Sequence, residues 1–209
     1  MNQLTTKQER FWRDIYAKEY IKRNNSFDLD SGIKAWSEMV KNLEPISSIL
    51  ECGCNIGRNI AVLNHLFPSA QKSIIEISPD AFELVTSTYN FSNPLNCAIS
   101  EADFQGDQFD LVFTAGVLIH ISPENLLLNL RKIYSFSKKY VIFCEMFSRT
   151  PKTVTYRGED DLLFTRDYGR FFLENFAVRV VDYGFLWGHY YDSAGFDDAH
   201  FWVFEKTAC

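Results

Sequence analysis

The chain has no excess of positive charge. Its 209 residues carry a formal net charge of −6 at pH 7, with a pI of about 5.2. Proteins that hold nucleic acid in a groove need a footprint of Lys and Arg, so the charge balance argues against nucleic acid as a partner. The start of the chain also lacks the apolar core of a signal peptide, and no hydrophobic run approaches membrane-spanning length. We therefore expect a cytoplasmic protein with no membrane partner.

Cysteine is scarce, and its spacing matches no common ligand pattern. The sequence has five cysteines without a C-x-x-C pair: Cys52, Cys54, Cys97, Cys144 and Cys209. We interpret them as thiols, mostly buried, in a reducing compartment. The alternative is a zinc site at Cys52 and Cys54 with a histidine, but this spacing fits no tetrahedral pattern. The acidic residues of the last third are spread over two loops, so we expect no metal ion.

One stretch organises the chain: residues 48–59 have the sequence S-I-L-E-C-G-C-N-I-G-R-N. An apolar run of the length of a buried parallel strand ends at Glu51, and Gly53 and Gly57 follow before a helical pattern begins. A strand that turns sharply into a helix through glycines brings backbone amides and a helix N-terminus close to a ligand. The stretch differs from the dinucleotide fingerprint G-x-G-x-x-G, because its third position is not glycine.

Strand and helix patterns alternate from this stretch onward. Further strands are expected at residues 72–77, 95–98, 109–114 and 140–144, and a closing pair at 178–185 and 200–205. Such alternation predicts an α/β fold with a Rossmann-like, doubly wound, mostly parallel seven-stranded sheet and an antiparallel last strand. Ligands of such sheets lie over the carboxyl ends of the strands. The polar residues expected at that edge are Glu51, Glu76, Thr114, His120 and Glu145.

The pattern E-x-G-x-x-x-G in the glycine turn resembles the first motif of class I S-adenosylmethionine-dependent methyltransferases. Over nearly its full length the chain also resembles the methylases associated with pseudaminic acid biosynthesis. The stretches that carry this resemblance are F-W-R-x-x-x-x-x-E-Y-I-x-R-N, E-C-G-C-N-I-G-R-N, G-V-L-I-H-I-S-P-E-N-L, Y-R-G-E-D-D-x-L-F-x-R-D and V-D-Y-G-F. The resemblance implies a bacterial enzyme of surface polysaccharide biosynthesis that uses S-adenosyl-L-methionine and releases S-adenosyl-L-homocysteine.

The cofactor contacts are expected at the strand ends and on the first helix. Glu76 stands nineteen residues after Gly57, where an acid can accept hydrogen bonds from both ribose hydroxyls. The alternative for Glu76 is a solvated acid at a strand end. The first helix is either a lid that touches the cofactor or a helix that only packs on the domain. The full set of expected contacts is Trp12, Tyr20, Arg23, Glu51, Gly53, Asn55, Gly57, Asn59, Glu76, Ile77, Ser100, Thr114 and Ala115.

Catalysis by such an enzyme needs alignment of acceptor, methyl group and sulfur more than covalent chemistry. A hydroxyl acceptor also needs a base, and His120 is the first candidate, followed by Glu145 and His189. The alternative for His120 is a structural histidine that bonds the backbone of a loop. An acceptor oxygen of a carboxylate or phosphate would need no base.

The acceptor is expected between two loops of the last third. Arg157 favours an anionic acceptor, because its planar fork suits carboxylate or phosphate. Tyr156, Trp187, Tyr190 and Tyr191 are expected to cover a sugar face. The alternative is an ion pair between Arg157 and an aspartate that only orders its loop.

We expect one domain, 1–209, in three parts: an N-terminal helical lid (1–45), a cofactor-binding core (46–146) and acceptor-side loops with closing strands (147–209). Thr6 and Glu9 form a capping box for a first helix whose apolar side includes Ile15, and Asp30 is expected to cap the second helix. Residues 147–164 lack periodicity and are expected to be an irregular functional loop. Thr165 is expected to cap the last helix.

Three functions fit this organisation. The favoured one is methylation, on oxygen, of a small polar acceptor such as an acidic or nucleotide-linked sugar, by a monomer or homodimer. The second is methylation of another acceptor. That acceptor is a small metabolite that bears phosphate, phosphoramidate or carboxylate, or a protein or nucleic acid. A cofactor-binding module without catalysis is the third.

Overall fold

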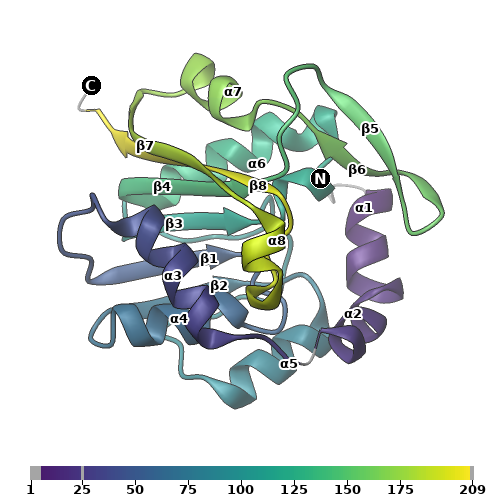
Figure 1. The fold of residues 1–209 in the computed structure, drawn as a ribbon, viewed down its shortest axis with the longest axis horizontal. Coiled ribbons are helices and arrows are strands. Elements are labelled where there is room, and N and C mark those ends of the chain that lie inside the picture. Colours follow the sequence, from purple (N-terminus) through teal and green to yellow (C-terminus); the bar gives the residue numbers. More distant parts are fainter. Residues whose placement is uncertain (1–5, 25, 208–209) are drawn as a thin grey trace.

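The computed structural model describes residues 6–24 and 26–207 and contains a central six-stranded sheet (Figure 1). In spatial order its strands are β2 (Gln71–Ile75), β1 (Ser48–Cys52), β3 (Phe109–Ala115), β4 (Ser137–Glu145), β8 (Ala199–Lys206) and β7 (Val178–Leu186). β8 is antiparallel to both of its neighbours, and the pairs among β2, β1, β3 and β4 are parallel. The mostly parallel sheet with an antiparallel last strand is therefore confirmed.

Eight α-helices connect and flank the strands of the described part of the chain. They are α1 (Lys7–Arg10), α2 (Ala17–Arg23), α3 (Leu29–Val40), α4 (Arg58–Leu66), α5 (Pro79–Thr88), α6 (Pro123–Phe136), α7 (Tyr168–Asn175) and α8 (Gly188–Tyr191). A π-helical segment at Phe11–Ile15 joins α1 to α2, and single 3-10 turns lie at Leu118–His120 and Asp192–Ala194. Within the described residues, every helix is too short or too polar to cross a membrane.

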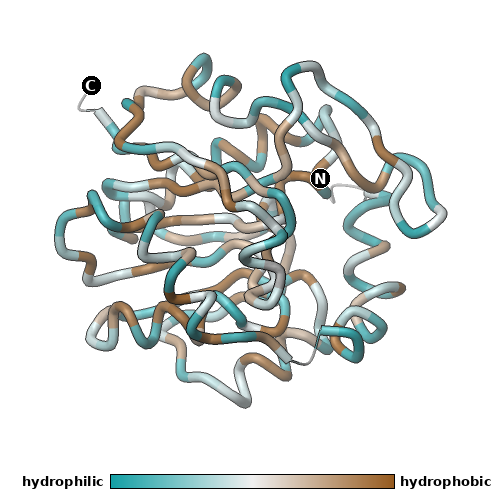
Figure 2. Tube along the Cα trace, viewed as in Figure 1, coloured by the Kyte–Doolittle hydropathy of each residue, from teal (hydrophilic) through white to brown (hydrophobic). Residues whose placement is uncertain are grey.

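The sheet has a hydrophobic layer on each face, because neighbouring residues of a strand point to opposite sides. Ile49 and Phe113 pack with Trp36 of α3, whereas Leu50 packs with Leu130 of α6. Helices α3 and α4 thus cover one face, and α6 and α7 cover the other (Figure 1). The hydropathy of the trace follows this arrangement, with apolar residues concentrated in the strands (Figure 2).

The prediction of a strand at residues 95–98 is wrong, so the sheet has six strands and not seven. Around Leu95 the chain makes a single parallel bridge to Ile75 and then leaves the sheet. The Leu95 N–H donates to the Ile74 carbonyl and the Leu95 carbonyl accepts from the Glu76 N–H. Two backbone bonds are enough to fix the chain beside β2 but too few to extend a strand.

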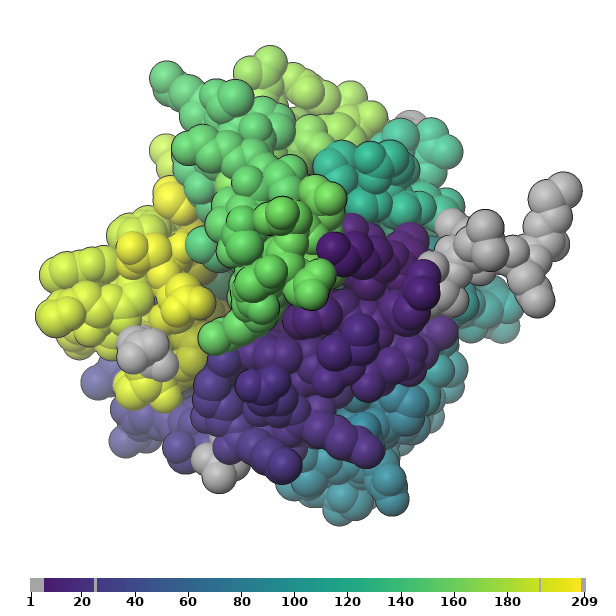
Figure 3. Space-filling model, turned by 90° about the vertical axis from the view of Figure 1, so that its right-hand side faces the viewer, coloured from purple at the N-terminus to yellow at the C-terminus, as the bar shows by residue number. Residues whose placement is uncertain are grey.

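The expected irregular loop at residues 147–164 is also wrong, because most of it is a β-hairpin of β5 (Lys152–Tyr156) and β6 (Glu159–Thr165). Its two-residue turn has Arg157 and Gly158 both at positive φ, 56° and 79°, as primed hairpin turns require. The hairpin packs on the N-terminal helical segment: the Lys7 Nζ donates to the Asp160 carbonyl at 2.8 Å and the Gln8 Nε2 to the Asp161 carbonyl at 2.7 Å. The two segments adjoin on one face of the molecule (Figure 3).

Helix starts follow the side chain that reaches a free amide. The capping box of Thr6 and Glu9 is confirmed. Asp28, not Asp30, caps α3 by accepting from the Asp30 N–H, and Asp167, not Thr165, caps α7, since Thr165 still belongs to β6. Ile15 is 67% exposed, because the π-helical segment adds a residue to the turn and rotates Ile15 off the apolar side.

Candidate active site

One cavity of about 1020 Å³ lies over the carboxyl ends of β1, β2, β3 and β4. The N-terminal segment and the β5–β6 hairpin form its outer wall, and residues 193–197 form another side. Of the residues expected from the sequence, those that line it are Trp12, Tyr20, Arg23, Gly53, Asn55, Asn59, Glu76, Ile77, Ala115, His120, Glu145, Tyr156 and Arg157. Residues more than 140 positions apart in sequence thus meet at one edge of the sheet.

The glycine turn after β1 has a backbone that side chains would obstruct. Gly53 and Gly57 both have φ near 80°, and Asn55 between them has φ 44°. A Cβ on Gly53 would lie 2.6 Å from Val117 Cγ2, and one on Gly57 would lie 2.6 Å from Val85 Cγ2. Both positions therefore require glycine for conformation and for space. Gly53 lines the cavity, whereas Gly57 supports the turn from behind.

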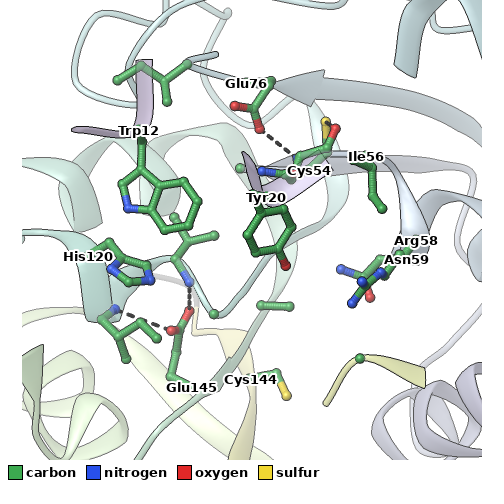
Figure 4. A pocket seen from close by; sticks show the side chains of 18 of the residues that line it. Trp12, Tyr20, Cys54, Ile56, Arg58, Asn59, Glu76, His120, Cys144 and Glu145 are labelled. Atoms are coloured by element: carbon green, nitrogen blue, oxygen red, sulfur yellow. Dashed lines mark hydrogen bonds between the residues drawn. The ribbon is translucent and has the colours of Figure 1, made fainter. Parts of the chain in front are cut away.

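Glu76 connects this turn to the end of β2. Its Oε2 accepts from the Asn55 N–H at 2.7 Å, and its Oε1 accepts from the Ser78 N–H at 2.8 Å. The residue is only 4% exposed, and this burial raises the pKa of the carboxyl group above its usual value. A carboxylate oxygen can accept more than one hydrogen bond. Glu76 lines the cavity and therefore retains acceptor capacity toward it (Figure 4).

Glu51 lies beneath the turn and does not line the cavity. Its Oε1 accepts from Asn59 Nδ2 at 2.7 Å, and Asn59 Oδ1 accepts from the Trp36 indole at 3.0 Å. Burial raises the pKa of Glu51 to about 8, so the group is mostly protonated at neutral pH. The predicted cofactor contact of Glu51 is therefore wrong, because the residue does not line the cavity, whereas Asn59 does.

Glu145, at the end of β4, holds the loop that follows β3. Its Oε1 accepts from the Thr114 hydroxyl at 2.8 Å and the Val117 N–H at 3.1 Å, and its Oε2 accepts from the Ile119 N–H at 3.4 Å (Figure 4). Burial raises its pKa to about 7. These hydrogen bonds order the loop, and Glu145 also lines the cavity. Thr114 is fully buried in the same network and does not reach the cavity.

His120 stands at the end of that loop with its ring among aromatic side chains. Its Nδ1 lies 2.8 Å from the Leu162 carbonyl of β6, which can only accept, so Nδ1 carries the proton and Nε2 has a free lone pair. Trp12 and Tyr156 have ring centroids 4.7 and 5.1 Å from the imidazole. Burial lowers its pKa to about 4, and the imidazole is therefore neutral at pH 7.

The N-terminal segment brings aromatic side chains over the cavity. Trp12 and Tyr20 make an edge contact with ring centroids 5.7 Å apart, and the Tyr20 hydroxyl is directed across the cavity toward Arg58 (Figure 4). Arg23 lines the rim. The segment is thus more than a helix packed on the domain, because its side chains form the cavity wall.

Several expected residues are not brought to the cavity. Trp187 is 55% and Tyr190 60% exposed, and Trp187 packs against His189 with ring centroids 4.7 Å apart. Neither these residues nor Tyr191 line the cavity, because α8 turns back over α3. Ser100 also lies off the cavity, and 97–99 line it instead. We therefore correct the assignments of His189, Trp187, Tyr190, Tyr191 and Ser100.

The sequence argument missed Arg58, the first residue of α4. It lines the cavity, and one guanidinium nitrogen donates to the Asn24 side-chain oxygen at 2.7 Å, while the buried Nε has no hydrogen-bond partner among the described residues. Its position directly after Gly57 was the available signal, because the first residue of a helix at such a turn faces the ligand. Within residues 6–24 and 26–207, no group of three or more His, Cys, Asp or Glu is arranged to hold a metal ion. Cys209 lies outside these residues.

A family model described as a methyltransferase domain matches residues 49–139. Three solved structures share the fold at low identity. A S-adenosylmethionine-dependent methyltransferase from Leishmania major has a TM-score of 0.73 at 18% identity, over 95% of this chain and 81% of that one. The 1,6-didemethyltoxoflavin-N1-methyltransferase of Burkholderia thailandensis gives 0.68 at 14%, over 92% and 87%. The magnesium protoporphyrin IX methyltransferase of Synechocystis gives 0.62 at 15%, over 99% and 100%. No curated protein matches.

The chain has the class I methyltransferase fold, and residues 49–139 are similar to methyltransferase domains. Both findings agree with the expected use of S-adenosylmethionine, whose site is expected over the glycine turn. The resemblance to methylases associated with pseudaminic acid stays a prediction.

Proposed function

We propose that this methyltransferase transfers the methyl group of S-adenosylmethionine to a small, polar, anionic acceptor. The observation that carries the proposal is a single cavity with two unlike ends. One end has the glycine turn and Glu76, and the other has His120, Tyr156 and Arg157. A volume of about 1020 Å³ is at the upper limit of the roughly 300–1,000 Å³ typical of small-molecule pockets, which suits a donor together with a small acceptor.

Residues of this chain would hold the donor at the glycine end. Glu76 offers its remaining acceptor capacity to the ribose, and the backbone around Gly53 allows close approach. Trp12 and Tyr20 close the outer side and exclude water. The bound donor supplies an activated methyl group, so the work of the protein is to align the acceptor with it.

Arg157 supports an anionic acceptor. It projects from the hairpin turn at the cavity rim and, in the described part of the chain, forms no ion pair with a carboxylate. That observation counts against the alternative in which an aspartate pairs with Arg157 and merely orders the loop. Its guanidinium lies 5.4 Å from the Tyr156 ring centroid, which keeps the charge at the rim.

His120 is the best-placed base if the acceptor is a hydroxyl group. Its free Nε2 belongs to a neutral imidazole, and a positioned base contributes roughly 10²–10⁴-fold. The same histidine bonds the Leu162 carbonyl, so its structural role coexists with a catalytic one.

The resemblance to pseudaminic-acid-associated methylases supports a narrower proposal for the acceptor. It favours O-methylation of an acidic or nucleotide-linked sugar for a bacterial surface glycan. Another small phosphorylated or carboxylated metabolite is the alternative. The acidic net charge is unfavourable to nucleic acid.

The test is the kinetic behaviour of Arg157→Lys with acidic and nucleotide-linked sugars, followed by release of S-adenosylhomocysteine. We expect the KM for the acceptor to rise about tenfold or more while the affinity for S-adenosylmethionine stays unchanged, because lysine loses the bidentate fork. Lys152→Arg, on the same hairpin and away from the cavity, is the control. A drop in melting temperature with unchanged acceptor kinetics would make Arg157 structural.

A further inference from the structure

Three uncharged amide side chains of α1 and α6 line a part of the cavity that the glycine turn and Arg157 do not occupy. They are Gln8, Asn125 and Asn129, here named the amide face. Gln8 is 8% and Asn129 6% exposed. A buried amide costs free energy unless its hydrogen-bonding groups find partners, so the partners present decide what the amide face can bind.

Two backbone carbonyls fix the orientation of the buried amides. Gln8 Nε2 donates to the Asp161 carbonyl at 2.7 Å, and Asn129 Nδ2 donates to a carbonyl of its own helix, that of Asn125, at 2.9 Å. Because a carbonyl only accepts, each amide directs its nitrogen to the protein and keeps its oxygen for another partner. Among the described residues no donor reaches Gln8 Oε1 or Asn129 Oδ1, and neither atom is sealed from solvent. The amide face therefore presents hydrogen-bond acceptors to the cavity.

Contacts along the cavity wall connect His120 both to Arg157 and to the amide face. Tyr156 has its ring centroid 5.1 Å from that of His120, and the Arg157 guanidinium lies 5.4 Å from the Tyr156 centroid. In the other direction along the chain, Ser122 follows His120 by two residues and accepts from Asn125 Nδ2 at 2.9 Å. The candidate base thus lies next to both parts of the wall.

The two parts differ in charge. Among the described residues, the arginines that line the cavity lie on α2, α4 and the hairpin turn, and none lies on α1 or α6: Arg23, Arg58 and Arg157. Beside Gln8, the carboxylate of Glu9 completes the capping box of α1 and also lines the cavity. An anionic group of a ligand is therefore favoured at Arg157 and disfavoured at the amide face.

We propose that the amide face is the subsite for the uncharged, hydrogen-bond-donating part of the acceptor, namely its hydroxyl or amide N–H groups. This inference rests on the proposed function, since it divides the same small acceptor into an anionic end at Arg157 and a donor-rich end at the amide face. A polyhydroxylated acid satisfies both ends, whereas an acid without O–H or N–H groups satisfies only one. The adenine amino group of S-adenosylmethionine has the same donor chemistry. The acceptor is favoured because Ser122 joins the amide face to the His120 loop.

The test is titration calorimetry on protein saturated with S-adenosylhomocysteine, with three acids as probes. Glucuronate and N-acetylneuraminate are sugar acids with hydroxyl groups, and cyclohexanecarboxylate is a ring acid without them. Asn129→Leu, which is similar in size, should lower the affinity for both sugar acids about fivefold or more, because their donors lose an acceptor. It should leave the affinity for cyclohexanecarboxylate unchanged. Asn125→Leu is the second variant, with the same expectation should Asn129→Leu fail to fold.

Asn175→Leu is the matched control. Asn175 Nδ2 also donates to a backbone carbonyl of its own helix, that of Phe171, at 2.8 Å, but it lies on α7 away from the cavity. The control variant thus loses the same type of bond without changing the amide face. It should leave the affinity for all three acids unchanged.

Each other outcome overturns the inference. Unchanged affinity for the sugar acids in both variants would make the amides structural, and an equal loss for cyclohexanecarboxylate would show a general disturbance of the cavity. A loss of affinity for S-adenosylhomocysteine alone would assign the amide face to the adenine amino group. Binding of cyclohexanecarboxylate but of neither sugar acid would refute the subsite and leave the anionic acceptor of the proposed function intact. Binding of S-adenosylhomocysteine but of none of the acids would also refute the subsite, whereas no binding of S-adenosylhomocysteine would refute the proposed function.

Discussion

Replacing Glu76 by alanine tests the cofactor end of the cavity. The carboxylate has two tasks: it ties the glycine turn through the Asn55 N–H and the start of α5 through the Ser78 N–H, and it offers acceptor capacity to the ribose. The substitution removes both. Its effect on stability and its effect on affinity can be worked out separately.

Two amides, that of Ser78 buried and that of Asn55 partly buried, lose a charged acceptor in Glu76→Ala. An unsatisfied buried group costs about 1–3 kcal/mol, so the free energy of unfolding should fall by about 2–6 kcal/mol. A chain of this length changes its Tm by about 2–4 °C per kcal/mol, which gives a decrease of at least about 4 °C. The ribose loses one or two hydrogen bonds to a charged group, each about 1.5–3 kcal/mol, so the affinity should fall by about tenfold or more.

The assay is calorimetric titration with S-adenosylhomocysteine below the Tm of each variant, with the Tm measured in parallel without ligand. Asp80→Asn is the control, because Asp80 is an exposed acid of the neighbouring helix start and does not line the cavity. Glu76→Ala with its Tm lowered but its affinity within threefold of the parent would refute the ribose assignment. Unchanged Tm and unchanged affinity would refute the account of the turn as well.

Four further outcomes are expected. Gly53→Ala should lose cofactor binding, because its Cβ would meet Val117, whereas Gly158→Ala, also at positive φ but in open space and away from the cavity lining, should lose much less; equal binding by both variants would contradict this. Burial raises the folded-state pKa of Glu51 to about 8 from 4.5. The contribution of this group to stability is therefore full below pH 4.5 and is lost as pH rises through 8. Thermal scans should show that Glu51→Gln raises the Tm most at about pH 8.5 and least at about pH 5. His120→Asn should lower kcat about 10²-fold or more with a hydroxyl acceptor while the affinity for S-adenosylmethionine stays unchanged, and an unaltered kcat would make the histidine structural. Glu145→Gln places an amide donor against loop amides and should lower kcat through displacement of His120, with Thr114→Val giving a smaller loss because the bonds to the loop amides remain.

The parts of the fold that were predicted correctly depend on local patterns with few alternatives. Apolar runs followed by glycine or an acid predict the four parallel strands, and the capping box at Thr6 follows from side chains next to free amides. The strand near Leu95 was not distinguishable from a real one, because its bridge to Ile75 differs only in length. Strand length depends on how far a neighbour continues, which the local sequence does not contain.

The cavity residues divide in the same way. Gly53, Asn55 and Glu76 follow from one turn and one strand end, so their order in the chain already places them together. The predictions for Trp187, Tyr190 and Tyr191 rest on composition, since aromatic residues in a loop suggest a sugar site, and His189 in the same loop is predicted only as a candidate base. The direction of that loop is decided by how α8 packs on α3, and it turns these side chains outward.

The β5–β6 hairpin carries part of the cavity rim, and the spacing of residues in the sequence does not predict its position. A turn of Arg157 and Gly158 is a hairpin signal only if the flanking segments pair, and Lys152–Tyr156 is largely exposed. What holds the hairpin is contact with the N-terminal segment: Leu162 packs with Phe11 and Tyr16, and the Asp160 and Asp161 carbonyls accept from Lys7 and Gln8. The partner that makes the hairpin stable is thus about 150 residues away in sequence. The same contact places the Arg157 guanidinium 5.8 Å from the Tyr16 ring centroid at the cavity rim, so the position of this charge exists only in the folded chain.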